Sequence, residues 1–554
     1  MKLSKILGTA VVLMLVCATT ANAQTWQLLN NQPGPGGTIS GVGALLQLRD
    51  GRIIFHHEDQ AGAYTDWWIL TPDAYGSYVN GTWSPTGLLP SNYAPTYFGS
   101  QHLINASTPA TDAHCPVGNC GQVVIEGGEY NFTASSDTNL GALATYQPWG
   151  PLNWVANAAP KDSTGATWRR IGDAASITLA NGRYMQTSCC DGQTPAGGQF
   201  AIYNGPNSWL VDGNGKQSST DESGLTLLTN DLVLMVDAKR TTACGTTTAQ
   251  QNMSSELYTM TNLVTGQGTW ACGPTLVTKL WNNADEELGV SAMLYNNKVL
   301  QIGGSVIGTN IYDVATNSWS LGPNPPDSLD QSDGPGAIEP NGKLLVMMSP
   351  GLFLNGCYML EYDPTANSFA YTGSPQDCTP PSTDTSYSGH LMIVPTGQII
   401  FSAFVPHVEM YTPAPGLATW TCNSCNPIQT VSIPATILLS STILHSGSLN
   451  NVVYGYQLNG LTQNNFYGDD NQMDTNFPLA RITCANVIGN GCTPGYVYYA
   501  FTHDDGPAGP TVHSIAPHHF GYTKFDLPVV PAGTYDFQTV TNGIPSNSIR
   551  VTVQ

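Results

Sequence analysis

The amino-acid sequence predicts an all-β protein in which a seven-bladed β-propeller is followed by an immunoglobulin-like β-sandwich. Charged residues make up only 10% of the 554 residues, while Gly and Pro number 58 and 38. This composition favours short strands and tight turns, and no long segment shows the apolar spacing of a surface helix. An aromatic residue also recurs regularly, since Trp270, Trp319, Phe369 and Trp420 follow one another after 49, 50 and 51 residues. A period near 50 residues is typical of a propeller blade.

The N-terminal segment has the three parts of a secretory signal peptide. Lys2 and Lys5 carry positive charge, residues 6–17 are largely apolar, and ANA at positions 21–23 offers small residues for cleavage. We therefore expect residues 1–23 to be removed as a signal peptide. No later stretch is apolar for long enough to span a membrane. The sequence thus predicts a secreted protein, extracellular or periplasmic.

Each repeat consists of a hairpin, a strand with Tyr and a strand with Trp or Phe. The hairpins contain turn residues, as in ASITLANGRYM and HLMIVPTGQIIF, and lie near residues 44, 121, 175, 225, 291, 335 and 391. Four strands in such a unit are typical of a kelch-type propeller, which we assign to residues 24–425. The segment TWQLLNN around Trp26 is similar to the Trp strand, so we expect it to pair with the last blade and close the ring. The recurring Tyr and Trp side chains are expected to pack between blades.

The repeat ends after Trp420. Residues 426–554 contain no Trp and consist of short alternating segments, among them VVYGYQLNGL, GYVYYAFTH and SIRVTVQ. Alternation of apolar and polar residues between turn residues predicts strands with one buried face. We therefore expect an immunoglobulin-like domain in residues 426–554.

Twelve of the 13 cysteines follow the predicted signal peptide, and an even number suits an oxidising compartment. They fall into close pairs, so local disulfides are the simplest arrangement, although a bridge between the adjacent Cys189 and Cys190 would be strained. The disulfide candidates are Cys115 with Cys120, Cys244 with Cys272, Cys357 with Cys378, Cys422 with Cys425, and Cys484 with Cys492.

The net charge of −21 comes from a scarcity of Lys and Arg rather than from acidic runs. A chain this anionic is not expected to bind nucleic acid or anionic lipid through a basic surface. The expected partner is an extracellular glycan or a surface polymer. Aromatic residues in AYTDWWIL and YGSYVNGTW are candidates for stacking on sugar rings.

Several motifs resemble those of the galactose oxidase and glyoxal oxidase superfamily. In HCPVGNCGQVVIEGG a Cys-Pro precedes a strand that ends in Gly127-Gly128, a second double glycine stands at Gly303-Gly304, and SYSGHLMIVPTG contains Tyr387. The resemblance implies a kelch-type propeller followed by an immunoglobulin-like early-set domain. It also implies a copper site of two Tyr and two His, with one Tyr cross-linked to a Cys. Phenolate and imidazole are suitable ligands for Cu(II).

Most of the copper site implied by this resemblance is missing. Cys115 stands where the cross-linked cysteine belongs, but Asp173 replaces the tyrosine that should meet it and cannot hold a radical. Tyr387 matches the second tyrosine, whereas Ser388 replaces the histidine that should follow, and His390 lies two residues further on. The loop that should supply the other histidine, NNFYGDDNQMDTNFPL, contains none. We therefore predict no catalytic residue, and we expect Cys115 in a disulfide.

Acidic residues recur at the predicted mouth of the propeller, where each blade begins its innermost strand. This position points toward the central channel, so we expect the side chains to bind a ligand or a cation there. A ring of hard oxygen ligands suits Ca²⁺ better than copper. The alternative is that these are ordinary turn residues in an acidic chain. The candidates are Asp173, Glu222, Glu287, Asp333 and Tyr387, with Asp112 and Asp384 in a looser register.

Two histidine groups are weaker candidates for metal sites. His56-His57-Glu58-Asp59 lies on a strand, where adjacent side chains point to opposite faces, so both histidines cannot readily serve one ion. The second group combines His513, His518 and His519 with Asp504 and Asp505 in a loop-like stretch.

Two functions follow from these observations. The first is a secreted propeller that binds a glycan or another extracellular surface ligand without copper-radical catalysis and has no assigned cofactor except a candidate Ca²⁺. The alternative is a copper-dependent oxidoreductase of the galactose or glyoxal oxidase type with a rearranged site.

Overall fold

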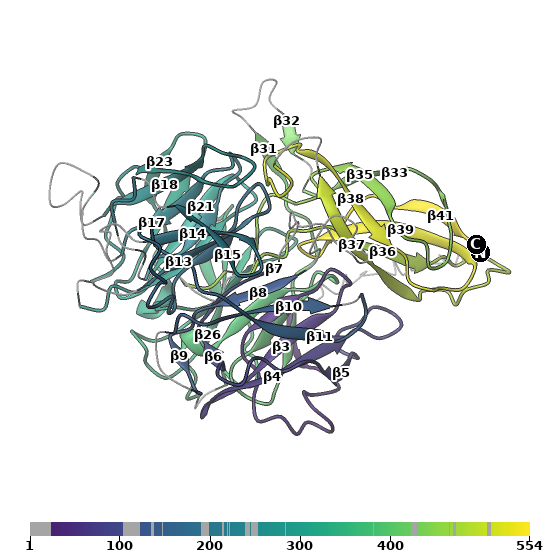
Figure 1. Cartoon of the computed structure of the whole chain (residues 1–554), viewed down its shortest axis with the longest axis horizontal. Coiled ribbons are helices and arrows are strands. Elements are labelled where there is room, and N and C mark those ends of the chain that lie inside the picture. Colours follow the sequence, from purple (N-terminus) through teal and green to yellow (C-terminus); the bar gives the residue numbers. More distant parts are fainter. Residues whose placement is uncertain are drawn as a thin grey trace, which may run out of the picture.

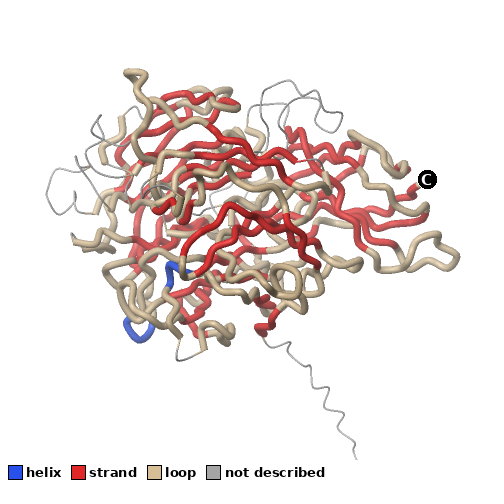
Figure 2. The backbone as a smooth tube through the Cα atoms, turned by 60° about the horizontal axis from the view of Figure 1, so that its bottom comes forward, coloured by secondary structure: helices blue, strands red, loops and turns tan. Residues whose placement is uncertain are grey.

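A computed structural model describes residues 24–554 except for 103–121, 134–137, 147, 190–198, 213–214, 219, 221, 239–243, 245–252, 283, 380–381, 423–428, 432, 465, 469–472 and 507–510. Within this part of the chain nearly all regular structure is strand, as Figure 2 shows. The helical segments described are two single 3₁₀ turns, η1 (Pro326–Ser328) and η2 (Ser386–Ser388). No helix among the described residues is long and apolar enough to cross a membrane. The all-β prediction is confirmed.

Seven four-stranded antiparallel sheets form the propeller (Figure 1). The first three blades, each from its innermost to its outermost strand, are β2 (Leu45–Gln47), β3 (Ile53–Asp59), β4 (Gly62–Thr71) and β5 (Thr82–Pro85); β7 (Gly99–His102), β8 (Val123–Glu126), β10 (Gly141–Tyr146) and β11 (Leu152–Asn157); and β12 (Ser176–Thr178), β13 (Tyr184–Ser188), β14 (Gln199–Gly205) and β15 (Ser208–Asp212).

The remaining four blades follow the same plan. They are β16 (Leu225–Leu227), β17 (Val233–Val236), β18 (Ser255–Met260) and β19 (Gly268–Cys272); β20 (Leu288–Met293), β21 (Lys298–Gly303), β22 (Thr309–Asp313) and β23 (Ser318–Leu321); β24 (Gly336–Ile338), β25 (Leu344–Met348), β26 (Tyr358–Asp363) and β27 (Ser368–Tyr371); and β28 (His390–Ile393), β29 (Ile399–Ser402), β30 (Glu409–Thr412) and β1 (Thr25–Leu28).

The first strand of the described chain closes the ring. β1 pairs with β30 of the last blade, with Trp26 opposite Tyr411 and their ring centroids 4.9 Å apart. The innermost strand of the first blade, β2, contacts both β28 and β7, so the first and last blades are neighbours around the axis. The predicted role of the Trp26 segment is therefore confirmed, and a sheet edge that would otherwise be open is covered.

The recurring Tyr and Trp residues pack inside the propeller. In the third to seventh blades the Tyr of the third strand lies directly opposite the aromatic residue of the fourth strand, as Tyr258 does with Trp270 and Tyr312 with Trp319, at 5.2 Å between centroids. In the first two blades Trp83 and Trp154 lie opposite Leu70 and Ala144 instead. Trp270 also contacts Phe200 of the preceding blade at 4.9 Å. These rings belong to the hydrophobic core and join neighbouring blades, as expected.

Two details differ from the sequence prediction. The innermost strand of the second blade is β7 (Gly99–His102), which lies well before the hairpin expected near residue 121. It pairs with β8, although residues 103–121 lie between the two strands in the sequence. Trp420 does not lie in the outermost strand of the last blade, because β1 occupies that edge. It lies instead in β31 (Trp420–Cys422), which pairs with β32 (Gln429–Val431).

The C-terminal strands form one curled nine-stranded sheet, which we call the cap; it lies beside the ring of blades in Figure 1. Phe525 and Phe537 are 5.0 Å apart although two strands separate β38 from β39 in the sheet, so the sheet folds over one hydrophobic core. The cap strands are β33 (Thr436–Leu439), β34 (Ile443–Leu444), β35 (Asn451–Tyr456), β36 (Leu479–Cys484), β37 (Val497–Gly506), β38 (Phe520–Asp526), β39 (Gly533–Thr541), β40 (Ile544–Pro545) and β41 (Ile549–Val553).

The connection between β35 and β36, residues 457–478, reaches the innermost propeller strands and is called the cap loop here. Phe466 forms a β-bridge with Gly336 at the start of β24. The side-chain amide of Asn464 pairs with the backbone N–H and C=O of Ile338, at 2.7 and 2.8 Å. Gln463 donates to the carbonyl of Thr178 in β12 at 2.8 Å. The cap loop thus links two blades near the axis.

Candidate functional site

The five residues predicted to surround the mouth of the propeller lie together in the structure. Four of them stand three positions before the innermost strand of a blade, and Glu287 directly precedes β20. Innermost strands converge on the axis, so residues at their beginnings converge as well. Asp173, Glu222, Glu287, Asp333 and Tyr387 all line one cavity of about 400 Å³, which we call the mouth pocket.

Four further residues line the mouth pocket, and the sequence analysis missed them. The strands β6 (Pro95–Thr96) and β9 (Tyr130–Asn131) pair to form a two-stranded ribbon. Glu129 and Tyr130 lie at the start of β9, and Tyr97 directly follows β6. Phe353 comes from the loop after β25. The only sequence signal for this second group was Gly127-Gly128, which ends a strand just before Glu129. None of the nine lining residues is basic.

Three carboxyl groups of the mouth pocket lie close together, and we call them the carboxylate trio. One oxygen each of Glu222, Glu287 and Asp333 lies within 4.8 Å of the others. Glu287 is only 8% exposed, and its Oε2 makes no hydrogen bond to the described residues. Glu222 and Asp333 have φ angles of 55° and 43°, in the left-handed region that few non-glycine residues adopt.

The surroundings of Glu287 favour its neutral form. Burial is the main cause, and the negative charges of Asp333 and Asp173 add to it, so that the pKa of Glu287 rises to about 10. A carboxyl group with such a pKa is protonated at neutral pH. A cation among the trio would reverse this preference, because an opposite charge nearby favours the ionised form.

Four aromatic residues also line the pocket, and we call them the aromatic wall. They are Tyr97, Tyr130, Phe353 and Tyr387. Tyr387 lies edge-to-face with Tyr97 at 6.2 Å and with Phe353 at 5.7 Å, and Tyr97 lies 6.4 Å from Tyr130. Tyr130 and Phe353 are the exposed members, at 44% and 42%. The pocket therefore combines acidic and aromatic lining residues.

The cap loop supports the mouth pocket from the side of the axis. The hydroxyl of Tyr467 donates to the backbone carbonyl of Tyr387. Gly468 lies against the carboxyl group of Asp333, and a Cβ at position 468 would clash with it. The backbone N–H of Asp333 donates to the carbonyl of Leu288 at 3.3 Å, which ties the sixth blade to the fifth. Tyr387 and Asp333 are thus positioned by contacts outside their own blades.

The donor set does not fit a copper-radical cofactor. Of the ligands implied by the resemblance, only Tyr387 lines the pocket. The Ser388 hydroxyl donates to the carbonyl of Thr385 at 2.8 Å, and His390 is buried with its ring stacked on Tyr467, 5.6 Å between centroids. Burial lowers the pKa of His390 to about 4. Carboxylates rather than imidazoles and phenolates dominate the site, and Cys115 lies outside the described residues.

The remaining metal candidates are held by protein hydrogen bonds. His56 contacts Glu58 at 2.5 Å and the carbonyl of Tyr64 at 2.7 Å, while His57 contacts Asp66 at 2.9 Å and Ser40 at 3.0 Å. The two rings have separate partners, as expected for adjacent strand residues. The second group is dispersed in the same way.

In that second group, His513 pairs with Asp474 at 2.8 Å, Asp504 pairs with Lys524 at 2.9 Å, and His519 contacts the Thr511 hydroxyl at 3.4 Å. Asp505 pairs instead with Arg49 of the first blade. Asp384 is buried and accepts a hydrogen bond from Gln60 at 3.4 Å, and it does not line the mouth pocket. Asp112 lies outside the described residues.

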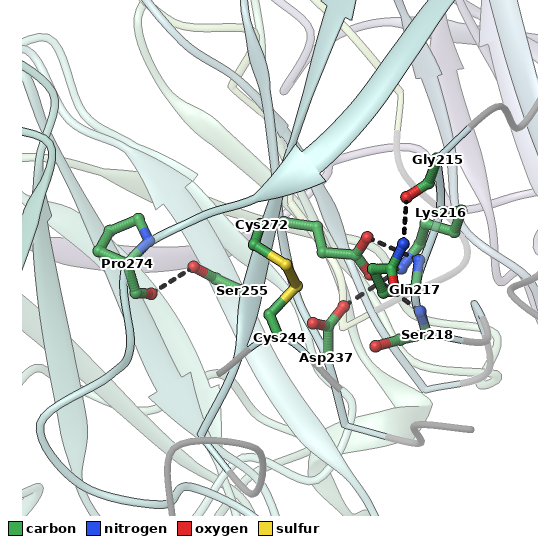
Figure 3. The surroundings of a disulfide bond; sticks show 10 residues. Gly215, Lys216, Gln217, Ser218, Asp237, Cys244, Ser255, Cys272 and Pro274 are labelled. Atoms are coloured by element: carbon green, nitrogen blue, oxygen red, sulfur yellow. Dashed lines mark hydrogen bonds and ion pairs between the residues drawn. A yellow bond between two sulfur atoms is a disulfide. The ribbon is translucent and has the colours of Figure 1, made fainter. Parts of the chain in front are cut away.

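Three predicted disulfides are present, Cys244–Cys272, Cys357–Cys378 and Cys484–Cys492. Figure 3 shows Lys216 and Asp237 beside the first of them; the Lys216 ammonium lies 3.2 Å from Asp237 and also contacts Glu256. The predicted pair of Cys115 and Cys120 lies outside the described residues, as does Cys425, the partner predicted for Cys422.

Comparison with known proteins assigns no family to the chain and finds distant structural neighbours. No family model matches the chain, and no curated protein matches it. YCF48 from Cyanidioschyzon merolae aligns with a TM-score of 0.39 and 9% identity, over 70% of this chain and 99% of that one. The extracellular domain of BT4673, described as a one-component system of B. thetaiotaomicron, aligns with a TM-score of 0.39 and 10% identity, over 93% of this chain and 57% of that one. The assignment of a seven-bladed propeller therefore rests on strand order and register.

Proposed function

We propose that this chain is a secreted propeller protein that binds an extracellular ligand, a glycan or another surface polymer, through a cationic group held in the mouth pocket, without copper-radical catalysis. The observation that carries the proposal is the lining of one cavity by five carboxyl groups and four aromatic rings, with no basic residue among them. Such a pocket attracts positive charge, because several carboxylates around one point repel one another until a cation joins them.

The size of the pocket supports a ligand larger than an ion. Its volume of about 400 Å³ falls within the range of pockets that hold small organic molecules. Two of the lining rings, Tyr130 and Phe353, are exposed and offer flat apolar faces to a sugar ring or to the methylene groups of a polymer. The disulfides and the absence of a membrane-spanning helix among the described residues are consistent with a secreted protein.

The proposal is tested by measuring retention of the mature protein on immobilised polymers of positive, neutral and negative charge. We expect retention on the cationic polymer, weakened by salt because exposed charge interactions are screened. Asp333→Asn should reduce retention. Asp285→Asn is the matched control, since Asp285 is exposed, lies two residues from Glu287 and does not line the pocket. Equal loss in both variants, or retention independent of charge, would contradict the proposal.

A further inference from the structure

We infer that the cationic group is the protonated primary amine of an amino sugar, so that the ligand is a glycan with free amino groups. This inference rests on the function proposed above and names the chemistry of the same site. Two features of the mouth pocket carry it, and both belong to the lining of the same cavity. The carboxylate trio matches the ammonium group, and the aromatic wall matches the sugar ring.

The trio has the dimensions of an ammonium site. Three oxygens that all lie within 4.8 Å of one another fit inside a circle of about 2.8 Å radius. A nitrogen on the axis of that circle therefore reaches all three at the distance of an N–H···O hydrogen bond. A primary ammonium has three N–H donors and no acceptor, which matches three carboxylate oxygens in number. Hydrogen bonds between such charged groups are short and strong.

Glu287 has one carboxyl oxygen left to accept a hydrogen bond. It is more than nine-tenths buried and belongs to the trio, in which its carboxyl group hydrogen-bonds with Asp333 and Glu222. Its Oε2 has no hydrogen-bond partner among the described residues. Buried carboxyl oxygens are nearly always paired, since an unpaired one is costly. An ammonium group bound at the trio would donate to this oxygen.

The aromatic wall explains why the amine should be carried on a ring. Tyr97, Tyr387 and Phe353 form a chain of edge-to-face contacts, so their faces are turned in different directions around the cavity. Aromatic faces attract a cation and also pack against the C–H groups next to it. A sugar ring attached to the amine would extend from the trio toward the exposed Phe353 and Tyr130.

A bare calcium ion fits these features less well. Ca²⁺ takes six to eight oxygens at about 2.3–2.6 Å, whereas the trio supplies three residues, and no other group of three or more metal-ligating side chains is found among the described residues. The ion would also leave most of the cavity of about 400 Å³ and the aromatic wall without a contact. A quaternary ammonium group would contact the aromatic wall, but it has no N–H group to donate a hydrogen bond to Glu287.

Binding of the amine requires a proton to leave the trio. Glu287 is neutral in the empty pocket, because burial and the nearby charges raise its pKa, and it becomes a carboxylate when the ammonium arrives. The proton goes to the buffer. The other titratable groups facing Glu287 in this pocket are the carboxyls of Asp173, Glu222, Asp333 and Glu129 and the hydroxyls of Tyr97, Tyr130 and Tyr387.

The experiment is isothermal titration calorimetry of the full mature chain with two probes that differ only at nitrogen. These are the hexamer of glucosamine and the hexamer of N-acetylglucosamine, with CaCl₂ and tetramethylammonium chloride as further titrants. We expect heat of binding with the free-amine hexamer and none with the acetylated one. Two buffers with different heats of ionisation should also reveal net proton release.

Two substitutions distinguish the contribution of the carboxylate trio to binding from that of the aromatic wall. Glu287→Gln keeps a neutral, equally large side chain but cannot ionise, so the affinity for the free-amine hexamer should fall about ten-fold or more. Phe353→Leu should lower the affinity for the free-amine hexamer more than the affinity for a single glucosamine. Asp285→Asn, outside the pocket, should leave the affinity unchanged.

The outcomes distinguish this inference from the proposed function. Equal binding of both hexamers, or unchanged affinity in Glu287→Gln, overturns the amino-sugar inference. Tight binding of Ca²⁺ or tetramethylammonium in competition with a cationic polymer overturns it as well, while the proposed function survives. If no cation and no cationic polymer binds, both are wrong.

Discussion

Arg49 of the first blade and Asp505 of the cap form a buried ion pair, with Nη2 2.5 Å from Oδ2. The guanidinium also lies 4.9 Å from the centre of the Phe477 ring, which ends the cap loop. Propeller and cap are therefore joined by charge as well as by apolar contact. This contact determines how the two parts should respond to mutation.

Removing one partner of this pair should destabilise the protein. Asp505→Ala leaves a buried guanidinium without its carboxylate, and we expect a loss of about 3–5 kcal/mol in the free energy of unfolding. Chemical denaturation followed by tryptophan fluorescence measures it. The control is Arg550→Ala, because Arg550 and Asp536 form an exposed pair that should contribute about 1 kcal/mol or less. Similar losses in both variants would contradict a structural role for the buried pair.

Closure of the ring should depend on Trp26. Its side chain packs on Tyr411 and Phe401, at 4.9 and 5.9 Å between centroids, from the strand that completes the last blade. Trp26→Ala should cost about 3 kcal/mol and lower the melting temperature. Gln27, next in β1, is exposed, so Gln27→Ala should have little effect. An unchanged melting temperature in Trp26→Ala would mean that the ring is stable without this contact.

The disulfides should differ in their contribution. Cys244–Cys272 closes 28 residues and Cys484–Cys492 only 8, so in the chain-entropy description the longer loop stabilises by about 1 kcal/mol more. Paired Cys→Ala variants and thermal melting test the order. Non-reducing peptide mapping should link the same partners and also Cys357 to Cys378; other linkages would disprove the pairing.

Stability should fall as pH rises, because of Glu287. Its pKa is about 10 in the folded protein and lies near 4.5 when the chain is unfolded. As pH rises, Glu287 thus loses its proton in the unfolded chain before it does so in the folded protein. The free energy of unfolding therefore falls between about pH 4.5 and pH 10. Glu287→Gln should reduce the slope of melting temperature against pH over this range, and Asp285→Asn should not. Equal slopes in wild type and Glu287→Gln would exclude this carboxyl group as the cause.

Copper loading should not produce an oxidase. A two-electron oxidation of an alcohol or aldehyde by the resembled enzymes needs a radical side chain beside the metal, and Asp173 cannot provide one. Asp173→Tyr alone should not restore activity, because Ser388 is bonded to Thr385 and His390 is stacked on Tyr467. Hydrogen peroxide formed from sugars or simple aldehydes by the copper-loaded protein would contradict this prediction.

The sequence by itself determined the features that arise within one blade. Hairpins, Tyr opposite Trp and the acidic residue before the innermost strand of four blades are local patterns, and a propeller turns such a repeat into a ring. For this reason Asp173, Glu222, Glu287, Asp333 and Tyr387 could be expected in one place, although what they bind stays a proposal.

Only the tertiary structure decided which residues outside the repeat join them. Glu129 and Tyr130 reach the mouth through the ribbon of β6 and β9, and Phe353 through a loop whose length follows no period. The cap loop contacts Asp333 and Tyr387 across 80 or more residues of sequence. Contacts of this kind depend on how blades and cap pack around the axis, and packing between distant segments leaves no periodic signal in the chain.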